Sequence, residues 1–336
     1  MSENRPKNET KSENESYNTN DSLIEAELLR AEIWKQIIEN QPNFSCRTRR
    51  NSGKFKLKEN RSLLLRYVFN KIICLRDQTP SDPVFMTHYS PLAEKQLESD
   101  FRYFQILSPP SREMIQFLES QFQKAAEQMK KSIIRKDEPV TGKEEGFLEY
   151  KGVRYSVDGE IWHKKDWWNS AIALRIRYDY LHLDTQGLSV PYKNLGFRSD
   201  ADILEAFASS FNHYFDRYHS AFPDLEKSMG SLGSFWARNR FEEPIIMVNP
   251  PFDVMLIEET IKKVIKCLEE AKQENRKQSW HLTLPAWRDV SSFTSLAHHP
   301  FCSSFTDIVH GKTLFIDCFT KKMIQPCDIF QIVLSV

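Results

Sequence analysis

The sequence predicts an α/β protein in which a helical unit precedes a doubly wound sheet. In roughly the first 146 residues, apolar side chains recur at helical spacing. From Ile203 onward, short apolar runs typical of strands alternate with helical patterns. The third observation is a turn, Asn249-Pro250-Pro251-Phe252, that directly follows one of these predicted strands. Ligands of doubly wound sheets bind at the carboxyl ends of strands, so this turn lies where a site is expected.

Length and charge limit the classes of protein to consider. A chain of 336 residues holds one large or two medium domains. Lysine plus arginine equals aspartate plus glutamate, which excludes a global basic field, so any affinity for nucleic acid must be local. No apolar leader and no 18-residue apolar run occurs, and the six cysteines form no Cys-x-x-Cys pair. We therefore expect an intracellular protein of the nucleus or cytoplasm, without a membrane span, a metal site or a zinc site.

The polar residues 1–20 predict a disordered tail, followed by a helical domain over residues 21–146. Ser22 and Glu25 have the spacing of a capping box, and the helix that they begin should end before Pro42. A second helix is expected over residues 60–75. A third begins at Ser111, after Pro109 and Pro110, and residues 137–146 predict a linker. The prolines at 80, 83 and 91 indicate loops.

The segment from Arg47 to Arg76 carries ten basic residues against one acid, Glu59. It has two interpretations. It is either a solvated face balanced by acids elsewhere, or a surface that contacts phosphates.

Residues 147–336 form the predicted α/β domain. Helical patterns cover residues 167–181, 211–218 and 257–268, and strand patterns cover 204–208, 244–248, 280–284, 313–319 and 329–334. The turn at Asn249 thus ends one strand and precedes a helix.

The four residues Asn249-Pro250-Pro251-Phe252 suit a particular reaction, methylation of a conjugated nitrogen. An amino group attached to a ring, such as N6 of adenine, is a poor nucleophile because its lone pair is delocalised. An asparagine oxygen and a proline carbonyl can each accept one of its N–H groups and localise that lone pair. Proline fixes the backbone, and the aromatic residue can stack on a base. The alternative is an ordinary Pro-Pro turn at a strand end.

Four blocks of the chain resemble the phosphorylated-CTD-interacting-factor family of adenosine N6-methyltransferases. They are Phe207–Asp224, Gly230–Phe235, Asn249–Phe252 and Leu284–Asp289, in the family's order. The resemblance covers roughly residues 167–335. It implies a Rossmann-like domain that uses S-adenosyl-L-methionine to methylate N6 of adenosine in RNA. In animal members the acceptor is the 2′-O-methyladenosine next to the mRNA cap.

The resemblance also implies roles for individual residues. Asn249, Pro250, Pro251 and Phe252 would be catalytic, and Asn249 and Phe252 would also contact the cofactor. Phe252, Trp287 and Arg288 would contact the RNA substrate. The other expected cofactor residues are Ala208, Ser209, Asn212, Gly230 and Gly233. We expect RNA as the partner of a monomeric protein.

The residues themselves leave simpler interpretations open. Ser209 and Asn212 could cap a following helix, whose N-terminus could also meet the carboxylate of the cofactor's methionine moiety. Trp287 could be a hydrophobic anchor, and Arg288 could form a surface pair with Asp289. Asp224 is either a turn residue or a cofactor contact. His298, His299 and His310 lack partners at ligand spacing, so we expect no metal there.

Two departures from the family pattern weaken the inference to cap-adjacent mRNA. Family members carry an acidic residue two positions after the motif phenylalanine, where this chain has Val254 beside Asp253. We also find no WW domain of the kind that animal members have. The alternatives are N6 methylation of DNA or of uncapped RNA, methylation of a protein glutamine, and an inactive RNA-binding relative.

Overall fold

The computed structural model describes residues 21–40, 42–48, 52–56, 61–73, 82–87, 90–103, 106–108, 111–131, 147–150, 152–156, 167–183, 188–199, 202–309, 315–317, 322–324 and 327–336. The predicted tail (1–20) and linker (137–146) lie outside them, as does His310. Structural statements below concern the described residues.

The first part of the chain consists mainly of four helices: α1 (Asp21–Glu39), α2 (Arg61–Ile73), α3 (Pro91–Tyr103) and α4 (Ser111–Lys131). A small sheet with the order β2-β1-β3 accompanies them, formed by β1 (Asn43–Thr48), β2 (Ser52–Lys56) and β3 (Ile106–Ser108). The helices predicted from Ser22, over 60–75 and from Ser111 are confirmed, within one or two residues at the described ends.

Helix α3 and the small sheet were not predicted. Pro91 indicated a loop, yet it is the first residue of α3, a position where its missing N–H costs nothing. The hydroxyl of Ser90 accepts a hydrogen bond from the Ala93 N–H at 3.3 Å and so caps the helix.

A short hairpin of β4 (Phe147–Tyr150) and β5 (Val153–Ser156) precedes α6 (Trp168–Tyr180), the helix predicted over 167–181. Residues from β6 (Leu188–Ser189) pair with β12 (Phe315–Asp317), which also pairs with β13 (Met323–Ile324). The strand predicted over 313–319 therefore exists at residues 315–317, but in this separate small sheet rather than in the main one.

The main sheet has six strands in the order β11-β14-β10-β9-β7-β8. They are β7 (Ile203–Ala208), β8 (Arg217–Ser220), β9 (Ile245–Val248), β10 (Ser279–Pro285), β11 (Cys302–Ile308) and β14 (Ile329–Ser335). Strands β8, β7, β9 and β10 are parallel, whereas β14 runs antiparallel to both β10 and β11. The strands predicted at 204–208, 244–248, 280–284 and 329–334 are confirmed, and β11 was not anticipated.

The path of the chain through this sheet creates a switch point between β7 and β9. From β7 the chain moves outward to β8 and then returns to the other side to form β9 and β10. Loops leaving β7 and β9 therefore diverge and open a crevice at their carboxyl ends, the usual ligand position in such sheets.

The segment 211–218 is not a helix, contrary to our prediction. It is a turn that enters β8 at Arg217. The buried carboxylate of Glu205 accepts hydrogen bonds from the Tyr214 N–H at 2.8 Å and the Phe215 N–H at 3.3 Å. Those N–H groups are thus taken from the bonds that a helix would need, and the ring of Phe215 packs against Tyr192.

Helix α8 (Val254–Gln273) joins β9 to β10 and packs on the sheet. Asp253 is its N-cap, and the Oδ1 atom accepts a hydrogen bond from the Leu256 N–H at 3.0 Å. Residues at helical spacing such as Ile257, Val264 and Leu268 are fully buried. The helix therefore begins immediately after the Asn-Pro-Pro-Phe turn and holds that turn against the sheet.

Smaller elements complete the described chain: η5 (Tyr192–Leu195), α7 (Pro223–Glu226), η6 (Lys227–Met229), η7 (Phe235–Ala237), α9 (Ser291–Thr294) and η8 (Ser295–His298). None of the described helices is long and apolar enough to cross a membrane.

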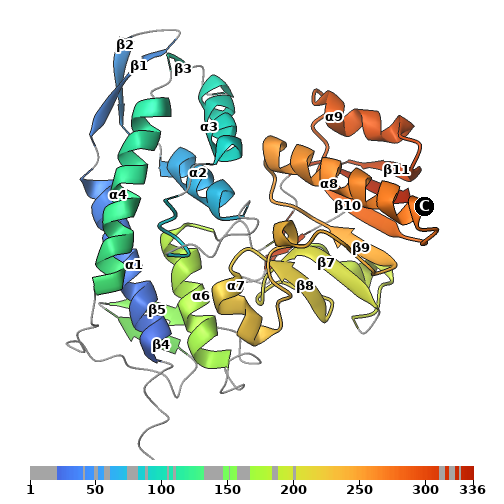
Figure 1. The fold of residues 1–336 in the computed structure, drawn as a ribbon, viewed down its shortest axis with the longest axis horizontal. Helices are drawn as coiled ribbons and strands as arrows, with labels where there is room; N and C mark the ends of the chain where they lie inside the picture. Colours follow the sequence, from blue (N-terminus) through green and yellow to red (C-terminus); the bar gives the residue numbers. More distant parts are fainter. Residues whose placement is uncertain are drawn as a thin grey trace, which may run out of the picture.

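One hydrophobic core runs through the helical part and the sheet, from Ile24 to Leu334. Figure 1 shows α1 and α4 on one side, the sheet on the other, and α2 and α3 facing α8. Helix α1 packs against α6, and Glu27 of α1 forms buried hydrogen bonds with Arg177 and Tyr180 of α6. The helical residues therefore share a core with the α/β residues.

Candidate active site

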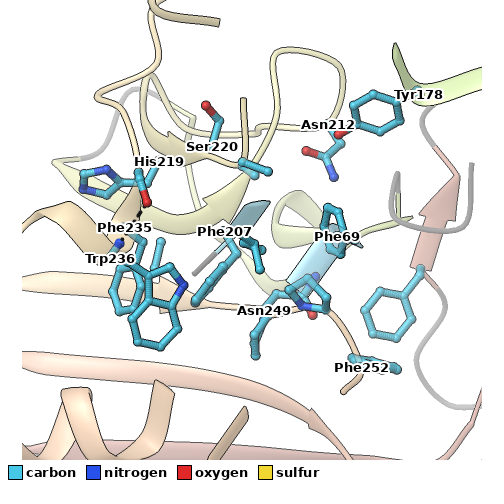
Figure 2. Close-up of a pocket in the computed structure, with 18 residues that line it drawn as sticks. Phe69, Tyr178, Phe207, Asn212, His219, Ser220, Phe235, Trp236, Asn249 and Phe252 are labelled. Carbon is cyan, nitrogen blue, oxygen red and sulfur yellow. Dashed lines mark hydrogen bonds between the residues drawn. The ribbon is translucent and has the colours of Figure 1, made fainter. Parts of the chain in front are cut away.

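A pocket opens at the switch point of the main sheet (Figure 2). Its cavity volume is about 240 Å³, and the cavity opens to solvent at its mouth. Its walls come from the ends of three parallel strands, the η7 segment, α6, α2 and β12. The lining residues are Phe69, Ile73, Tyr178, Ala206, Phe207, Ala208, Asn212, His219, Ser220, Ala221, Ser234, Phe235, Trp236, Asn249, Pro250, Pro251, Phe252 and Phe315.

All four residues of the Asn-Pro-Pro-Phe turn line this pocket. The side-chain oxygen of Asn249 is buried and accepts no hydrogen bond from the described residues. A buried acceptor without a partner is costly, which favours a ligand that donates to it. The Pro251 carbonyl accepts the Asp253 N–H at 2.8 Å, whereas the Pro250 carbonyl receives no backbone hydrogen bond from the described chain. Within the turn, Asn249 Oδ1 and the Pro250 carbonyl are therefore candidate acceptors for a ligand.

Phe252 is held edge-to-face by Phe315, with ring centroids 6.0 Å apart and planes at 82°. Sequence reasoning assigned Phe252 to the site but not Phe315, which comes from the separate small sheet. Tertiary contacts, among them the pairing of β12 with β6, bring Phe315 to the pocket, so no local signal could have identified it.

Ala208 and Asn212, two of the predicted cofactor residues, line the pocket, whereas Ser209 is buried and does not. The Asn212 Oδ1 atom accepts hydrogen bonds from the N–H and hydroxyl of Ser209, at 2.6 and 3.1 Å. These bonds orient the amide group of Asn212, which Figure 2 shows pointing into the pocket. Ser209 therefore caps no helix, but fixes the side chain of Asn212.

Gly230 and Gly233 adopt φ values of 104° and 96°, a backbone conformation that glycine tolerates best. Neither glycine lines the pocket. Gly233 instead supplies a carbonyl that accepts hydrogen bonds from the Ser220 N–H at 2.9 Å and from His219 Nδ1 at 3.0 Å. The two glycines therefore shape the approach to Ser234, Phe235 and Trp236, which do line the pocket.

His219 is a buried neutral side chain. Burial lowers its pKa to about 4, so it is uncharged at neutral pH. Figure 2 shows its imidazole pointing away from Asn249, and its ring packs edge-to-face on Phe241 at 6.0 Å. His219 thus contributes a neutral ring to the pocket wall.

Phe235 and Trp236 form the aromatic wall between β7 and α8. Phe235 packs against Phe207 with ring centroids 4.7 Å apart. The Lys263 ammonium of α8 donates to the carbonyls of Phe235 and Trp236, at 2.9 and 3.2 Å, and lies over both rings. This lysine fixes the wall by hydrogen bonds and cation–π contacts together.

Helix α2 supplies a pocket wall that sequence reasoning missed. Phe69 and Ile73 line the pocket from the helical part of the chain. Their apolar periodicity predicted a helix correctly, but an apolar side chain facing a core looks the same in a sequence as one facing a ligand. Tertiary packing decides which apolar side chains of α2 face the pocket and which face the core.

Trp287 and Arg288 lie after the carboxyl end of β10, outside the lining of the pocket. Trp287 stacks on Phe293 with ring centroids 5.9 Å apart. The exposed guanidinium of Arg288 binds Asp307 through two nitrogens and Asp328 through one, at 2.8–3.1 Å. Its surface partners are therefore Asp307 and Asp328, rather than the Asp289 that we considered.

Asp224 forms a bidentate ion pair with the buried guanidinium of Arg177, with both distances 2.8 Å. This geometry favours the structural alternative for Asp224, because both carboxylate oxygens are engaged by α6. Together with Glu27, it balances the buried charge of Arg177.

Two further carboxylates are buried beneath the turn that follows β7. Glu226 accepts hydrogen bonds from the N–H and hydroxyl of Ser210, at 2.6 and 3.1 Å, and Glu205 holds Tyr214 and Phe215. Burial raises the pKa of Glu205 and that of Glu226 to about 7. These groups anchor the turn that carries Asn212.

The structure describes the side chain of Lys71, one of the ten basic residues between Arg47 and Arg76. Lys71 of α2 is buried, forms an ion pair with Glu119 at 3.6 Å and lies near the ring of Phe122 at 5.7 Å. Lys71 therefore belongs to the helical core rather than to a phosphate-contacting surface. Arg49, Arg50, Lys58 and Arg76 lie outside the described residues. In the part of the chain that the structure describes, no group of three His, Cys, Asp or Glu side chains could hold a metal ion.

The fold and the site define a mixed α/β protein with a ligand-sized pocket at the switch point of a six-stranded mixed sheet. Residues 167–317 match the family model described as phosphorylated CTD interacting factor 1 WW domain. The matched range runs from α6 to β12 and contains every lining residue of the pocket except Phe69 and Ile73. The match supports a relationship to that family, located in the α/β part. A comparison with curated proteins found no match.

Proposed function

We propose that the protein is an S-adenosyl-L-methionine-dependent methyltransferase that methylates N6 of adenine in RNA. The observation that carries this proposal is the buried Oδ1 atom of Asn249, which lacks a partner among the described residues, in a pocket that Pro250 also lines. Two acceptors at this point suit an amino group whose two N–H groups must both be hydrogen-bonded before its lone pair is localised on nitrogen and can react.

The fold supports a Rossmann-like methyltransferase domain. Four parallel strands diverge at a switch point, and the candidate site lies at their carboxyl ends. The family relationship points the same way, since the matched residues include the whole turn from Asn249 to Phe252.

The residues present fit the proposed cofactor. Asn212 directs an amide into the pocket, where its NH₂ group can donate to the carboxylate of the methionine moiety. Ser220, at the end of β8, also lines the pocket, and its hydroxyl is paired with that of Ser231 at 2.6 Å. The wall formed by Phe207, Phe235 and Trp236 offers aromatic faces to a sulfonium cation and an adenine ring. When bound, S-adenosylmethionine supplies an electrophilic methyl group.

The chain's own residues would activate the acceptor. Asn249 Oδ1 and the Pro250 carbonyl accept the two N–H groups of the adenine N6, which concentrates electron density on that nitrogen. They also stabilise the positive charge that develops there, and one N6 proton leaves to solvent afterwards. Phe252, oriented by Phe315, stacks on the base. Positioning supplies much of the rate, and the adenine must be unpaired to expose N6.

We propose RNA as the acceptor because of the family relationship. The same relationship suggests a specific acceptor within RNA, the 2′-O-methyladenosine next to the cap. Asp253, the acid nearest to the position that Val254 occupies, caps α8 and binds Asn70. Its side chain is thus committed within the protein, and the acceptor is not restricted by an acidic contact at that position.

The test is methyl transfer by the wild-type protein to four acceptors. Capped and uncapped RNA beginning with adenosine, single-stranded DNA and a glutamine peptide are each incubated with labelled S-adenosylmethionine, and the products are identified by mass spectrometry. The proposal predicts N6-methyladenosine in RNA. Methylation of DNA alone or of the peptide alone would replace the acceptor, and transfer to none of them would refute the proposal.

A further inference from the structure

The helical part of the chain reaches the candidate site at one buried hydrogen bond. Asn70 of α2 donates through Nδ2 to Asp253 Oδ2 at 3.1 Å, and the two side chains are 4% and 5% exposed. The residues are 183 positions apart in the chain. One residue before Asn70, Phe69 contributes to the pocket itself.

Asp253 connects this bond to the Asn-Pro-Pro-Phe turn. Its other carboxylate oxygen accepts the Leu256 N–H at 3.0 Å and caps α8. Its backbone N–H donates to the Pro251 carbonyl at 2.8 Å, which fixes the turn from within. A shift of Asp253 would therefore move both the end of α8 and the turn that holds Phe252.

A second contact acts in the same place. Gln96 of α3 is 2% exposed, and its side-chain oxygen accepts the Met255 N–H at 3.4 Å. The first turn of α8 is thus bonded to two helices of the helical part. N–H groups in the first turn of a helix have no partner inside the helix, so such contacts determine where the helix begins.

From this geometry we infer that Asn70 is a positioning residue of the active site, acting through Asp253 on the Asn249–Phe252 turn. This inference rests on the proposed methyl transfer. It assigns to α2 a role in the reaction itself, because α2 lines the pocket and also fixes the position of the Asn249–Phe252 turn.

The hydrogen bond can be broken and then rebuilt in the opposite direction. Asn70→Asp places two carboxylates in contact, whereas Asp253→Asn keeps an oxygen for the Leu256 N–H and offers an NH₂ group that an inverted Asn70 amide can accept. In the double variant, the new amide at position 253 can donate to the new carboxylate at position 70. We expect kcat to fall about 10- to 100-fold in Asn70→Asp, as misplacement of a reacting group commonly does. The double variant should recover most of this loss.

Three further measurements separate positioning from simple stabilisation. The affinity for S-adenosylhomocysteine, measured by calorimetry, should change less than threefold, because the carboxyl ends of β7 and β8 are untouched. Lys71→Met, on the adjacent position of α2 but facing Glu119, should lower the unfolding temperature and leave kcat unchanged. Unfolding temperatures of all variants show that assays are run on folded protein.

The outcomes are distinguishable from those of the proposed function. Wild-type kcat in Asn70→Asp, or no recovery in the double variant, would overturn the role of Asn70 while leaving methyl transfer intact. A fall in kcat in Lys71→Met equal to that in Asn70→Asp would also overturn it. A wild-type protein without transferase activity would overturn both inferences.

Discussion

The proposed methyl transfer depends most on Asn249, which the sequence predicts as a catalytic residue and which lines the pocket. Asn249 lies between the end of a strand and a Pro-Pro pair, and both of these features can be seen in the local sequence. What the sequence could not show is which proline carbonyl is available. The structure answers this, since Pro251 binds the Asp253 N–H and Pro250 receives no backbone bond from the described chain.

Phe252 gives a prediction at the same scale. Phe252→Leu keeps apolar bulk but removes the aromatic face, and stacking on a base contributes about 1–3 kcal/mol. We expect KM for the RNA acceptor to rise by about 5- to 150-fold. Initial rates over a range of acceptor concentrations measure it, and an unchanged KM would remove Phe252 from the substrate site. Phe330→Leu, at a buried aromatic outside the lining of the pocket, is the control.

The buried ion pairs around Arg177 contribute to the stability of the fold rather than to the proposed reaction. Glu27 is fully buried and accepts hydrogen bonds from Arg30, Arg177 and Tyr180. Glu27→Ala would leave the guanidinium of Arg177 with only Asp224, and breaking a buried pair costs about 3–5 kcal/mol of unfolding free energy. Urea unfolding measures this loss. Glu127→Ala, which breaks an exposed pair with Lys130, should change stability little, and equal effects would contradict the prediction.

At the scale of elements, the turn after β7 differs most from what the sequence predicted. Its polar and aromatic residues suit a helix N-terminus, and residues 211–218 gave a helical pattern. The deciding groups, Glu205 and Glu226, lie on β7 and α7 and capture the N–H groups of the turn through tertiary contacts. Strands β7, β9, β10 and β14 were predictable because each is a short apolar run. Strand β11 was not, since it has no such run.

These two glutamates give a pH dependence whose sign follows from their raised pKa. Each unfolded carboxyl loses its proton near pH 4.5, while each folded one retains it to about pH 7. The unfolded state therefore binds fewer protons between these values, and the contribution of each group to stability falls as pH rises through that window. The full change is about 3 kcal/mol per group.

Glu205→Gln tests this sign. Glutamine keeps an oxygen for the Tyr214 N–H but does not titrate. The free energy of unfolding of the variant minus that of the wild type should increase from pH 5 to pH 8. Urea unfolding at both pH values measures this difference. A difference that is the same at both pH values would contradict the raised pKa.

At the scale of the whole molecule, the helical part and the sheet share one core. Residues 21–146 and 147–336 were predicted as separate domains from their different periodicities, which was the information the sequence offered. Their docking depends on α1 meeting α6, and α2 and α3 meeting α8, across long distances in the chain. No periodicity in either segment encodes these contacts.

A shared core predicts a single cooperative unfolding transition. Differential scanning calorimetry should show one peak, shifted to higher temperature by S-adenosylmethionine because a ligand of the native state stabilises it. Glu27→Ala should move the whole peak. Two separable peaks, of which only one responds to the ligand, would show that the helical part unfolds independently of the site.

The role of Asn249 in methyl transfer is tested most directly by transfer to adenosine-initiated RNA by Asn249→Ala, compared with the wild type at saturating S-adenosylmethionine. Removal of one acceptor that acts mainly in the transition state should lower kcat by about 100- to 1000-fold. Binding of S-adenosylhomocysteine, followed by thermal shift, shows that the variant remains folded and can bind the cofactor product. Undiminished transfer by the folded Asn249→Ala variant would contradict the account.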